Sequence, residues 1–367
     1  MSQTTAIDIG SHSLKWARVE FRPSQSPKLC HWGRIPLPFD TLTGNFNKLG
    51  LDDREQFEEA LEKVVKEARA GGDEIALTFP DQYIKVFFCE LDKLQDLTKK
   101  EREYTKWRLR QELPGSIVKD CILDYQHLTT VNKEQGPSFK IVVEAIRSQI
   151  LNEMTQVVAK EGSWPAFTNA NSFCCFNLFE EKLDPSAPRE TPICLIHIGH
   201  YSTTFSFFRN GILEYLRILD YAWHNFIETL QEIDDCQPEE AIEKLSKEEI
   251  LPRTGDTPPS ALKGIGMFRE IFEEWLREIE QTFAFYKSKH PYIESPIVYL
   301  CGGGAVLKNL SSFLSRLLAS PVEVLKPSEL VEFTCPSIPS ENEEIGLSAS
   351  IAAAVSWGEQ AREELED

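Results

Sequence analysis

The hydrophobic pattern predicts a β-hairpin at the start of the chain. Residues 5–9 form an apolar run that ends at Gly10, and residues 14–20 alternate apolar and polar side chains, as a half-buried strand does. A turn of glycine and serine between two such runs is typical of a hairpin. The stretch that follows, 23–38, is rich in turn residues and is predicted to be a connection.

The next elements are a helix, a strand and an inserted unit. Apolar residues recur at helical spacing over 53–70, and an apolar run over 75–79 predicts a buried strand. From 83 to about 168 the pattern becomes strand, helix, two strands and helix, and the helix at 98–113 opens on a capping-box sequence. This order predicts a small inserted subdomain.

The opening pattern recurs near residue 193. An apolar strand over 193–199, a polar turn and an apolar strand over 204–208 repeat the N-terminal arrangement. The proline-rich stretch 185–192 before them indicates a boundary between two lobes, and a length of 367 residues agrees with two domains. A later strand, 296–300, runs into three consecutive glycines, and a helix over 342–357 comes last.

Composition and charge narrow the range of functions. The chain has 39 Lys and Arg against 58 Asp and Glu, a formal charge of −19, which disfavours general binding to nucleic acid. Nine scattered cysteines without a CxxC pair favour a reducing compartment, the cytoplasm, and argue against structural zinc. We expect neither a signal peptide nor a membrane-spanning helix, so any membrane association would run through partners.

The first candidate site is the turn of the N-terminal hairpin. Its backbone N–H groups and hydroxyls can bind a phosphate, Asp8 can hold a divalent cation through water, and Lys15 can neutralise phosphate charge. A polar hairpin without any ligand explains the same residues equally well. The candidate residues are Asp8, Gly10, Ser11, His12, Ser13 and Lys15.

Two further turns complete the candidate chemistry. The second hairpin would face the first across a cleft and clamp a polyphosphate, while the glycine bend permits close approach to a planar ligand. A tight strand-to-helix turn needs only one or two glycines, and the spacing fits neither a dinucleotide fingerprint nor a Walker loop. The residues are Gly199, Ser202, Thr203 and Thr204 in the turn, and Gly302, Gly303, Gly304 and Ala305 in the bend.

The order and spacing of these three motifs resemble the phosphate-1, phosphate-2 and adenosine motifs of the actin–Hsp70–sugar kinase superfamily. Within it, the chain resembles the PilM/FtsA-like branch, and most of all the PilM family of type IV pilus assembly proteins. The similarity spans nearly the whole chain. Its segments are residues 6–15, 113–114, 123–126, 143–147, 216–217, 300–305 and 344–349.

The resemblance implies an α/β, two-lobed, actin-like (ribonuclease H-like) fold with an inserted 1C-type subdomain. The implied division is a first lobe over 1–185, which includes the insert at about 83–168, and a second lobe over 186–340. A C-terminal helix over 341–367 would return to the first lobe.

The resemblance also implies a ligand and a partner. The ligand is ATP with Mg²⁺, which Asp8 would hold through water. The partner is the N-terminal cytoplasmic peptide of a bitopic, PilN-like inner-membrane protein, together with other pilus or secretion machinery. The protein would then be cytoplasmic and peripheral at the inner membrane.

Two departures from the family pattern argue against catalysis. His197 stands where the second phosphate motif normally has aspartate, and losing one such preorganised group costs on the order of 10²–10³ in rate. Tyr221-Ala222 replaces a usual Gly-Gly pair and is expected to crowd a nucleotide. We therefore expect hydrolysis to be absent or very slow, and we assign no catalytic residue.

Three alternatives remain open at this point. The L component of type II secretion shares the fold and has a degenerate cleft. A small-molecule kinase would need a carboxylate base, and residues 166–172 offer amides and hydroxyls instead. An FtsA-like division protein would end in a basic amphipathic helix, whereas residues 359–367 are acidic.

Overall fold

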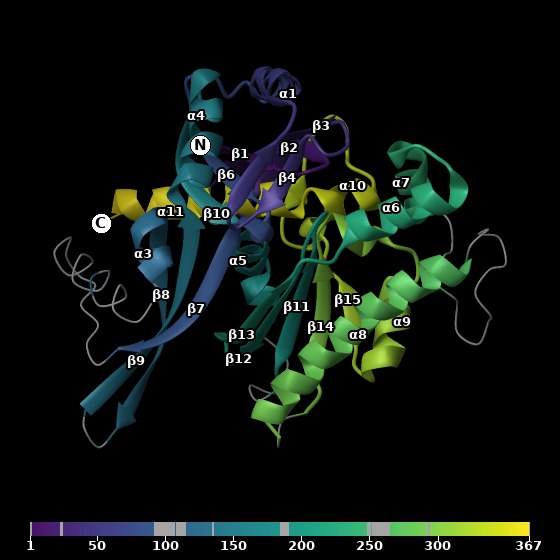
Figure 1. Ribbon diagram of the computed structural model, residues 1–367. Coiled ribbons are helices and arrows are strands. Elements are labelled where there is room, and N and C mark those ends of the chain that lie inside the picture. The colour runs from purple at the N-terminus through teal and green to yellow at the C-terminus, as the bar shows by residue number, and fades with distance from the viewer. Residues whose placement is uncertain are drawn as a thin grey trace.

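The computed structural model describes residues 2–22, 25–91, 107, 115–133, 136–183, 191–247, 251, 265–291 and 294–366. Two large sheets form the centres of two lobes that meet at a cleft (Figure 1). We call the part around the six-stranded sheet the first lobe and the part around the five-stranded sheet the second lobe. In the part of the chain that the structure describes, no helix combines the length and apolar character needed to cross a lipid bilayer.

The six-stranded sheet contains the N-terminal hairpin at its centre. Its spatial order is β10 (Trp164–Ala170), β6 (Glu74–Phe79), β1 (Ser2–Ile9), β2 (Ser13–Phe21), β3 (Lys28–Pro36) and β16 (Glu332–Phe333). Strands β1, β2 and β3 are antiparallel neighbours, whereas β6 and β10 run parallel to β1. The predicted hairpin and the strand at 75–79 are confirmed.

Strand β3 shows that the predicted connection over 23–38 was wrong. Residues 28–36 pair with β2 along almost their whole length. Leu29 enters the core, and Gly33 lies so close to the Trp16 indole that an added Cβ would come within 2.4 Å of its Nε1. The glycine and the flanking prolines therefore belong to a strand that closely approaches its neighbour, and they hid its alternating side chains.

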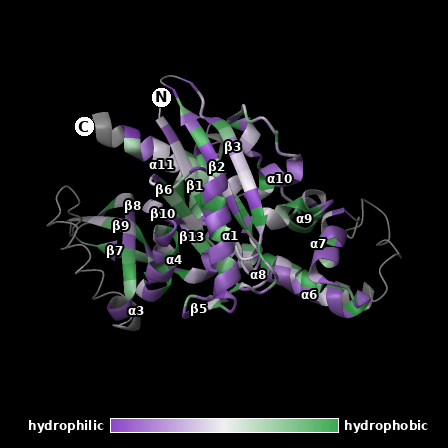
Figure 2. Ribbon diagram, turned by 90° about the horizontal axis from the view of Figure 1, so that it is seen from above, coloured by the Kyte–Doolittle hydropathy of each residue, from purple (hydrophilic) through white to green (hydrophobic). Residues whose placement is uncertain are grey.

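Helices cover both faces of this sheet. Ile7 and Ile9 point toward α1 (Arg54–Glu67) and α4 (Ser148–Lys160), whereas Ala6 and Ala17 point toward α5 (Asn171–Leu183) and α11 (Ser348–Glu366). This division follows from the period of two along a strand. Hydrophilic residues colour much of α1 where it lies over the sheet (Figure 2).

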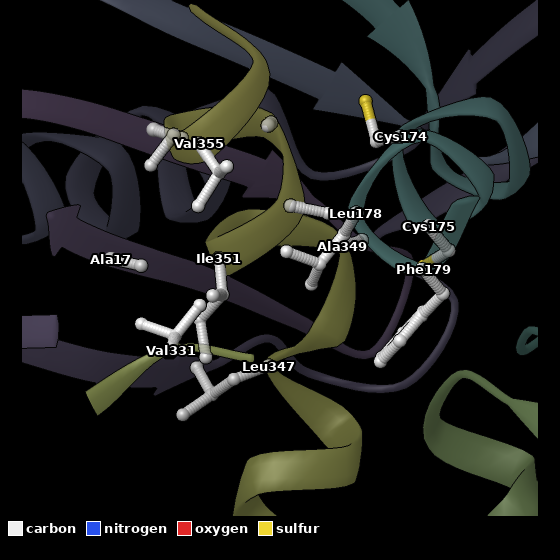
Figure 3. Packing of buried hydrophobic residues seen from close by; sticks show 14 of the residues in the cluster. Ala17, Cys174, Cys175, Leu178, Phe179, Val331, Leu347, Ala349, Ile351 and Val355 are labelled. Carbon is white, nitrogen blue, oxygen red and sulfur yellow. The ribbon is translucent and has the colours of Figure 1, made fainter. Parts of the chain in front are cut away.

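The C-terminal helix α11 is buried through small residues. Ala349 lies beside Leu178 of α5, whereas Ile351 lies near Val331 and Leu347, all within one buried cluster (Figure 3). The Thr4 hydroxyl in β1 donates a hydrogen bond of 2.7 Å to the carbonyl of Ala354. Small side chains let the helix approach the sheet closely. Because alanine and serine are only weakly hydrophobic, the buried and exposed faces of α11 differ little in hydrophobicity.

The five-stranded sheet has the same topology as the core of the first. Its order is β13 (Ile212–Leu219), β12 (Thr203–Arg209), β11 (Ile193–Ile198), β14 (Ile297–Cys301) and β15 (Val322–Val324). Again three antiparallel strands are followed by two parallel ones, so the sequence repeat marks a structural duplication. The surrounding helices are α6 (Trp223–Asp234), α7 (Pro238–Lys247), α8 (Ile265–Lys289), α9 (Leu310–Leu318) and α10 (Glu341–Gly346).

The insert is a long antiparallel sheet that projects from the first lobe (Figure 1). Its order is β7 (Ile84–Leu91), β9 (Gly136–Arg147) and β8 (Cys121–Lys133), with the short α3 (Gly115–Asp120) and the hairpin β4 (Leu42–Asn45) and β5 (Lys48–Leu51) nearby. A small core around Leu123, Ile141 and Val143 supports it. The predicted helix at 98–113 lies, apart from Trp107, outside the described residues.

Candidate functional site

The two hairpin turns and the glycine bend line one cavity between the lobes. Its volume is about 260 Å³. The sequence-predicted residues that line it are Asp8, Gly10, Ser11, His12, Ser13, Lys15, Gly199, Ser202, Gly302, Gly303 and Gly304. Two turns nearly 190 positions apart in the sequence therefore face each other, as the repeat suggested.

Three candidates lie behind the wall of the cavity. Thr203 donates a hydrogen bond of 2.7 Å to the carbonyl of Tyr221, and Thr204 donates one of 2.6 Å to Oδ2 of Asp81. Ala305 packs in the second-lobe core. These residues shape the site without facing a ligand.

Asp8 is fully buried, and both of its oxygens have partners. Oδ2 lies 2.6 Å from Nζ of Lys15, and Oδ1 accepts a hydrogen bond of 3.3 Å from Nδ2 of Asn171. Asn171 is fixed in turn, because its Oδ1 accepts from Thr78 at 2.7 Å. Asp8 and Lys15 are direct register partners on β1 and β2, so the hairpin brings the pair together.

The base of the cleft holds a second pair, which sequence reasoning missed. Asp81 lies in η1 (Asp81–Tyr83), a 3₁₀ turn in the first lobe, and Oδ2 of its carboxylate is 3.2 Å from Nδ1 of His197 at the end of β11. Oδ1 of Asp81 accepts a hydrogen bond of 3.0 Å from the Ser172 backbone N–H. The approach to His197 lacks the alignment of a hydrogen bond, so we describe it as an ion pair.

The two charges stabilise each other. Burial is the largest influence on Asp81 and would raise its pKa, but the His197 charge and the hydrogen bonds from Ser172 and Thr204 together outweigh it and hold that pKa below its usual range. Burial is the largest influence on His197 and would lower its pKa, but the interactions with Asp81 and the smaller ones with Cys175 and Asp8 together outweigh it and raise that pKa. The first and second lobes are thus joined by a buried carboxylate–imidazolium pair. One sequence signal for Asp81 was available: it is a polar residue just after the carboxyl end of β6, the strand that lies beside β1.

A cluster of aromatic rings, which we call the cleft mouth, includes His12 and His200 of the cavity lining. The His12 and His200 rings stack with their centroids 5.8 Å apart, and His224 lies 5.4 Å from His200. Burial, then the nearby Arg34 and Lys15 charges, lower the pKa of His12 to about 4. The Tyr201 hydroxyl donates a hydrogen bond of 2.6 Å to Oδ1 of Asp40 in the first lobe. Burial, together with the charges of His12, His224 and Lys15, also lowers the pKa of His200. His12 and His200 are therefore uncharged at neutral pH.

The glycine bend has two different roles. Gly302 has a φ of +84°, and an added Cβ would lie 2.7 Å from the carbonyl oxygen of Ile198. An added Cβ on Gly304 would lie 2.2 Å from Cγ2 of Ile198, whereas one on Gly303 would meet nothing within 4 Å. Two glycines are therefore explained by tight packing on β11, and Gly303 alone borders open space.

The expected crowding by Tyr221 and Ala222 is wrong. The Tyr221 hydroxyl donates a hydrogen bond of 2.7 Å to the carbonyl of Ile271, away from the cleft, and Ala222 is fully buried. Trp223, the next residue, lines the cavity instead. The pair directly precedes α6, which begins at Trp223, and the Tyr221 hydroxyl reaches the helical layer at Ile271 of α8.

The lining suits an anion better than a magnesium ion. Magnesium prefers an octahedral set of oxygen ligands that includes carboxylates. In the described lining, both Asp8 and Asp81 already have partners at each oxygen, and no cluster of three or more metal-ligating side chains lies in the described part of the chain. Lys15 and Arg34 face the cavity, and the buried Ser11 hydroxyl has no hydrogen-bond partner within the described residues.

Comparisons with known proteins agree with this architecture. One chain in the structure of the PilM–PilN type IV pilus biogenesis complex has a TM-score of 0.79 and 18% identity, covering 96% of this chain and 98% of that one. MreB 5 of Spiroplasma citri bound to AMPPNP has a TM-score of 0.50 and 10% identity, covering 100% and 98%. No curated protein matches the chain in sequence.

The duplicated sheets, the cleft and these likenesses define an actin-like fold, as the resemblance implied. The family described as type IV pilus assembly protein PilM matches residues 6–353, nearly the whole chain. The chain belongs to this PilM family, so both the predicted fold class and the predicted family are confirmed.

Proposed function

We propose that this protein is a cytoplasmic scaffold of type IV pilus assembly that binds the N-terminal cytoplasmic peptide of a PilN-like inner-membrane protein. The observation that carries the proposal is the family match over residues 6–353, supported by the full-length likeness to a chain of the PilM–PilN complex. The protein would reach the inner membrane through this partner.

We further propose that the cleft binds ATP with little or no hydrolysis. The facing turns, the inward Lys15 and the unpartnered Ser11 hydroxyl support an anionic ligand. Hydrolysis needs a group that can position or activate water. His197 occupies the position of the usual aspartate, and the carboxylate of Asp81 is held by Ser172, Thr204 and His197 itself.

A sugar-kinase role has less support. Asn169 accepts a hydrogen bond from the Ala170 backbone N–H, and Asn171 donates to Asp8. Neither amide can take a substrate proton. The stretch 166–172 supplies structural hydrogen bonds in place of a base.

A pull-down with a synthetic peptide from the cytoplasmic N-terminus of a PilN-like protein tests the scaffold function. We expect retention of the full chain on the peptide and no retention on a scrambled peptide of equal composition. Failure to bind, with and without ATP, would contradict the scaffold function. A type II secretion L-like role would be favoured if ATP also caused no thermal shift.

A further inference from the structure

The carboxylates of the cleft are saturated by the protein itself. Asp8 is held by Lys15 and Asn171, and Asp81 by Ser172, Thr204 and His197. Both aspartates are fully buried. A magnesium ion near either one would have to displace a cation from a buried carboxylate.

A third carboxylate lies at the rim of the cleft. Oε2 of Glu343 accepts hydrogen bonds of 2.8 and 2.6 Å from the backbone N–H and the hydroxyl of Ser340, which caps α10. Glu343 lies near Arg34, whose charge it offsets. Each described carboxylate of the cavity lining therefore already binds at least one group of the protein.

The groups left to meet a ligand are cationic or hydrogen-bond donors. Lys15 and Arg34 border the cavity, and the Nε2 edge of His197 faces Gly302, where an added Cβ would be 2.9 Å away. The Ser11 hydroxyl and the turn backbones add donors. A magnesium ion on the phosphates would place its own positive charge near Lys15, Arg34 and the imidazolium and would reduce the negative charge that these groups attract.

We infer that the cleft takes its nucleotide as the metal-free anion, with Lys15 and His197 supplying the positive charge that magnesium supplies in other sites. This inference rests on the proposed binding of ATP. The charges are the reverse of a magnesium site, in which free carboxylates face the metal. Here the two buried carboxylates, Asp8 and Asp81, face protein groups, and their counter-ions Lys15 and His197 line the cavity.

Calorimetric titration of the full chain with ATP, in excess MgCl2 and separately in excess EDTA, tests the inference. We expect binding in EDTA to be at least as tight as in MgCl2. Binding that is about tenfold or more tighter with magnesium would overturn the inference. Binding in neither buffer would also overturn it, while the peptide pull-down would still judge the scaffold function separately.

Two variants sharpen the test. His197→Asp places a second carboxylate beside Asp81, and like charges so close require a cation. This variant should therefore gain a thermal shift with MgCl2 alone, which the parent protein should lack. If the variant does not fold, the ratio of the two parent affinities decides the question by itself.

Lys15→Met provides the second variant. It should weaken ATP binding by about tenfold or more in both buffers, because a charge-assisted contact is lost. Lys28→Met is the matched control, since Lys28 pairs with Glu332 at the sheet edge, outside the cavity lining. Equal ATP affinities for these two variants would contradict the role given to Lys15.

Discussion

The two strand–turn–strand units of this protein have the same topology but neutralise their charges differently. Asp8-Ile9-Gly10 in the first lobe corresponds to His197-Ile198-Gly199 in the second. Asp8 finds its counter-ion Lys15 directly across the hairpin. The register partner of His197 is Thr204, and its counter-ion Asp81 comes from the other lobe.

Because of this difference, the charge of His197 is neutralised only by contact between the two lobes. The first unit is complete within one hairpin, so its electrostatics are local. The second unit is complete only when the lobes are together, because the Asp81 carboxylate bridges β11 and β12 of the second lobe to the first. The protein's own charges therefore span the gap between the two lobes.

The largest expected effect comes from removing the bridging carboxylate. Asp81→Asn should lower the free energy of unfolding by about 3–5 kcal/mol, because it leaves the buried His197 charge without a partner. Urea unfolding followed by circular dichroism measures the change. Asp73→Asn is the matched control, since its ion pair with Arg18 is half exposed and should contribute at most about 1 kcal/mol. Equal losses of unfolding free energy in the two variants would contradict a special role of Asp81 in joining the lobes.

A substitution in the glycine bend should have an intermediate effect on stability, and it should act only on the second strand–turn–strand unit. Gly304→Ala should cost about 1–3 kcal/mol of stability, because its Cβ would press on Ile198, between His197 and Gly199. Gly303→Ala, one position earlier, borders open space and should leave stability nearly unchanged. Thermal denaturation of the two variants compares them directly. A destabilised Gly303→Ala protein would contradict the position of Gly303 beside open space.

The smallest expected effect concerns the histidine of the first turn. The pKa of His12 is lowered to about 4, so its contribution to stability is complete above its ordinary pKa and is lost as the pH falls toward 4. Between pH 7 and pH 5 the parent protein should lose about 1–2 kcal/mol through this group. His12→Gln should not show this loss in urea unfolding at the two pH values. An identical pH dependence in the variant would contradict the account of the cleft mouth.

The opposite behaviour is expected of His197. Because its pKa is raised, its stabilising contribution is complete below the ordinary value and disappears as the pH rises through the raised one. The two turns therefore respond to pH with opposite sign, which separates their contributions in one titration series.

Much of this architecture could be predicted from local patterns. The hairpins, the buried strand at 75–79 and the triple-glycine bend each have a short-range signal, and the repeat of one pattern predicted the duplicated sheet. Strand β3 was missed because Gly33 and the nearby prolines imitate a loop. Its glycine is required by the Trp16 indole, which only the folded pairing of β2 and β3 brings close.

The candidate site was predictable in part. The motif positions placed the two turns correctly, but Asp81 has no motif and becomes meaningful only beside His197 from the other lobe. The direction of Tyr221 could not be read either, because its hydrogen bond to Ile271 depends on how α6 and α8 pack. Contacts between distant segments therefore account for what sequence reasoning missed.

A double-mutant cycle of Asp81→Asn and His197→Gln measures the coupling between the lobes most directly. Unfolding free energies of the parent, the two single variants and the double variant give the interaction energy of the pair. The buried ion pair predicts a coupling of about 2 kcal/mol or more, with the double variant recovering part of the single losses. Single-variant effects that add to within about 0.5 kcal/mol would contradict it.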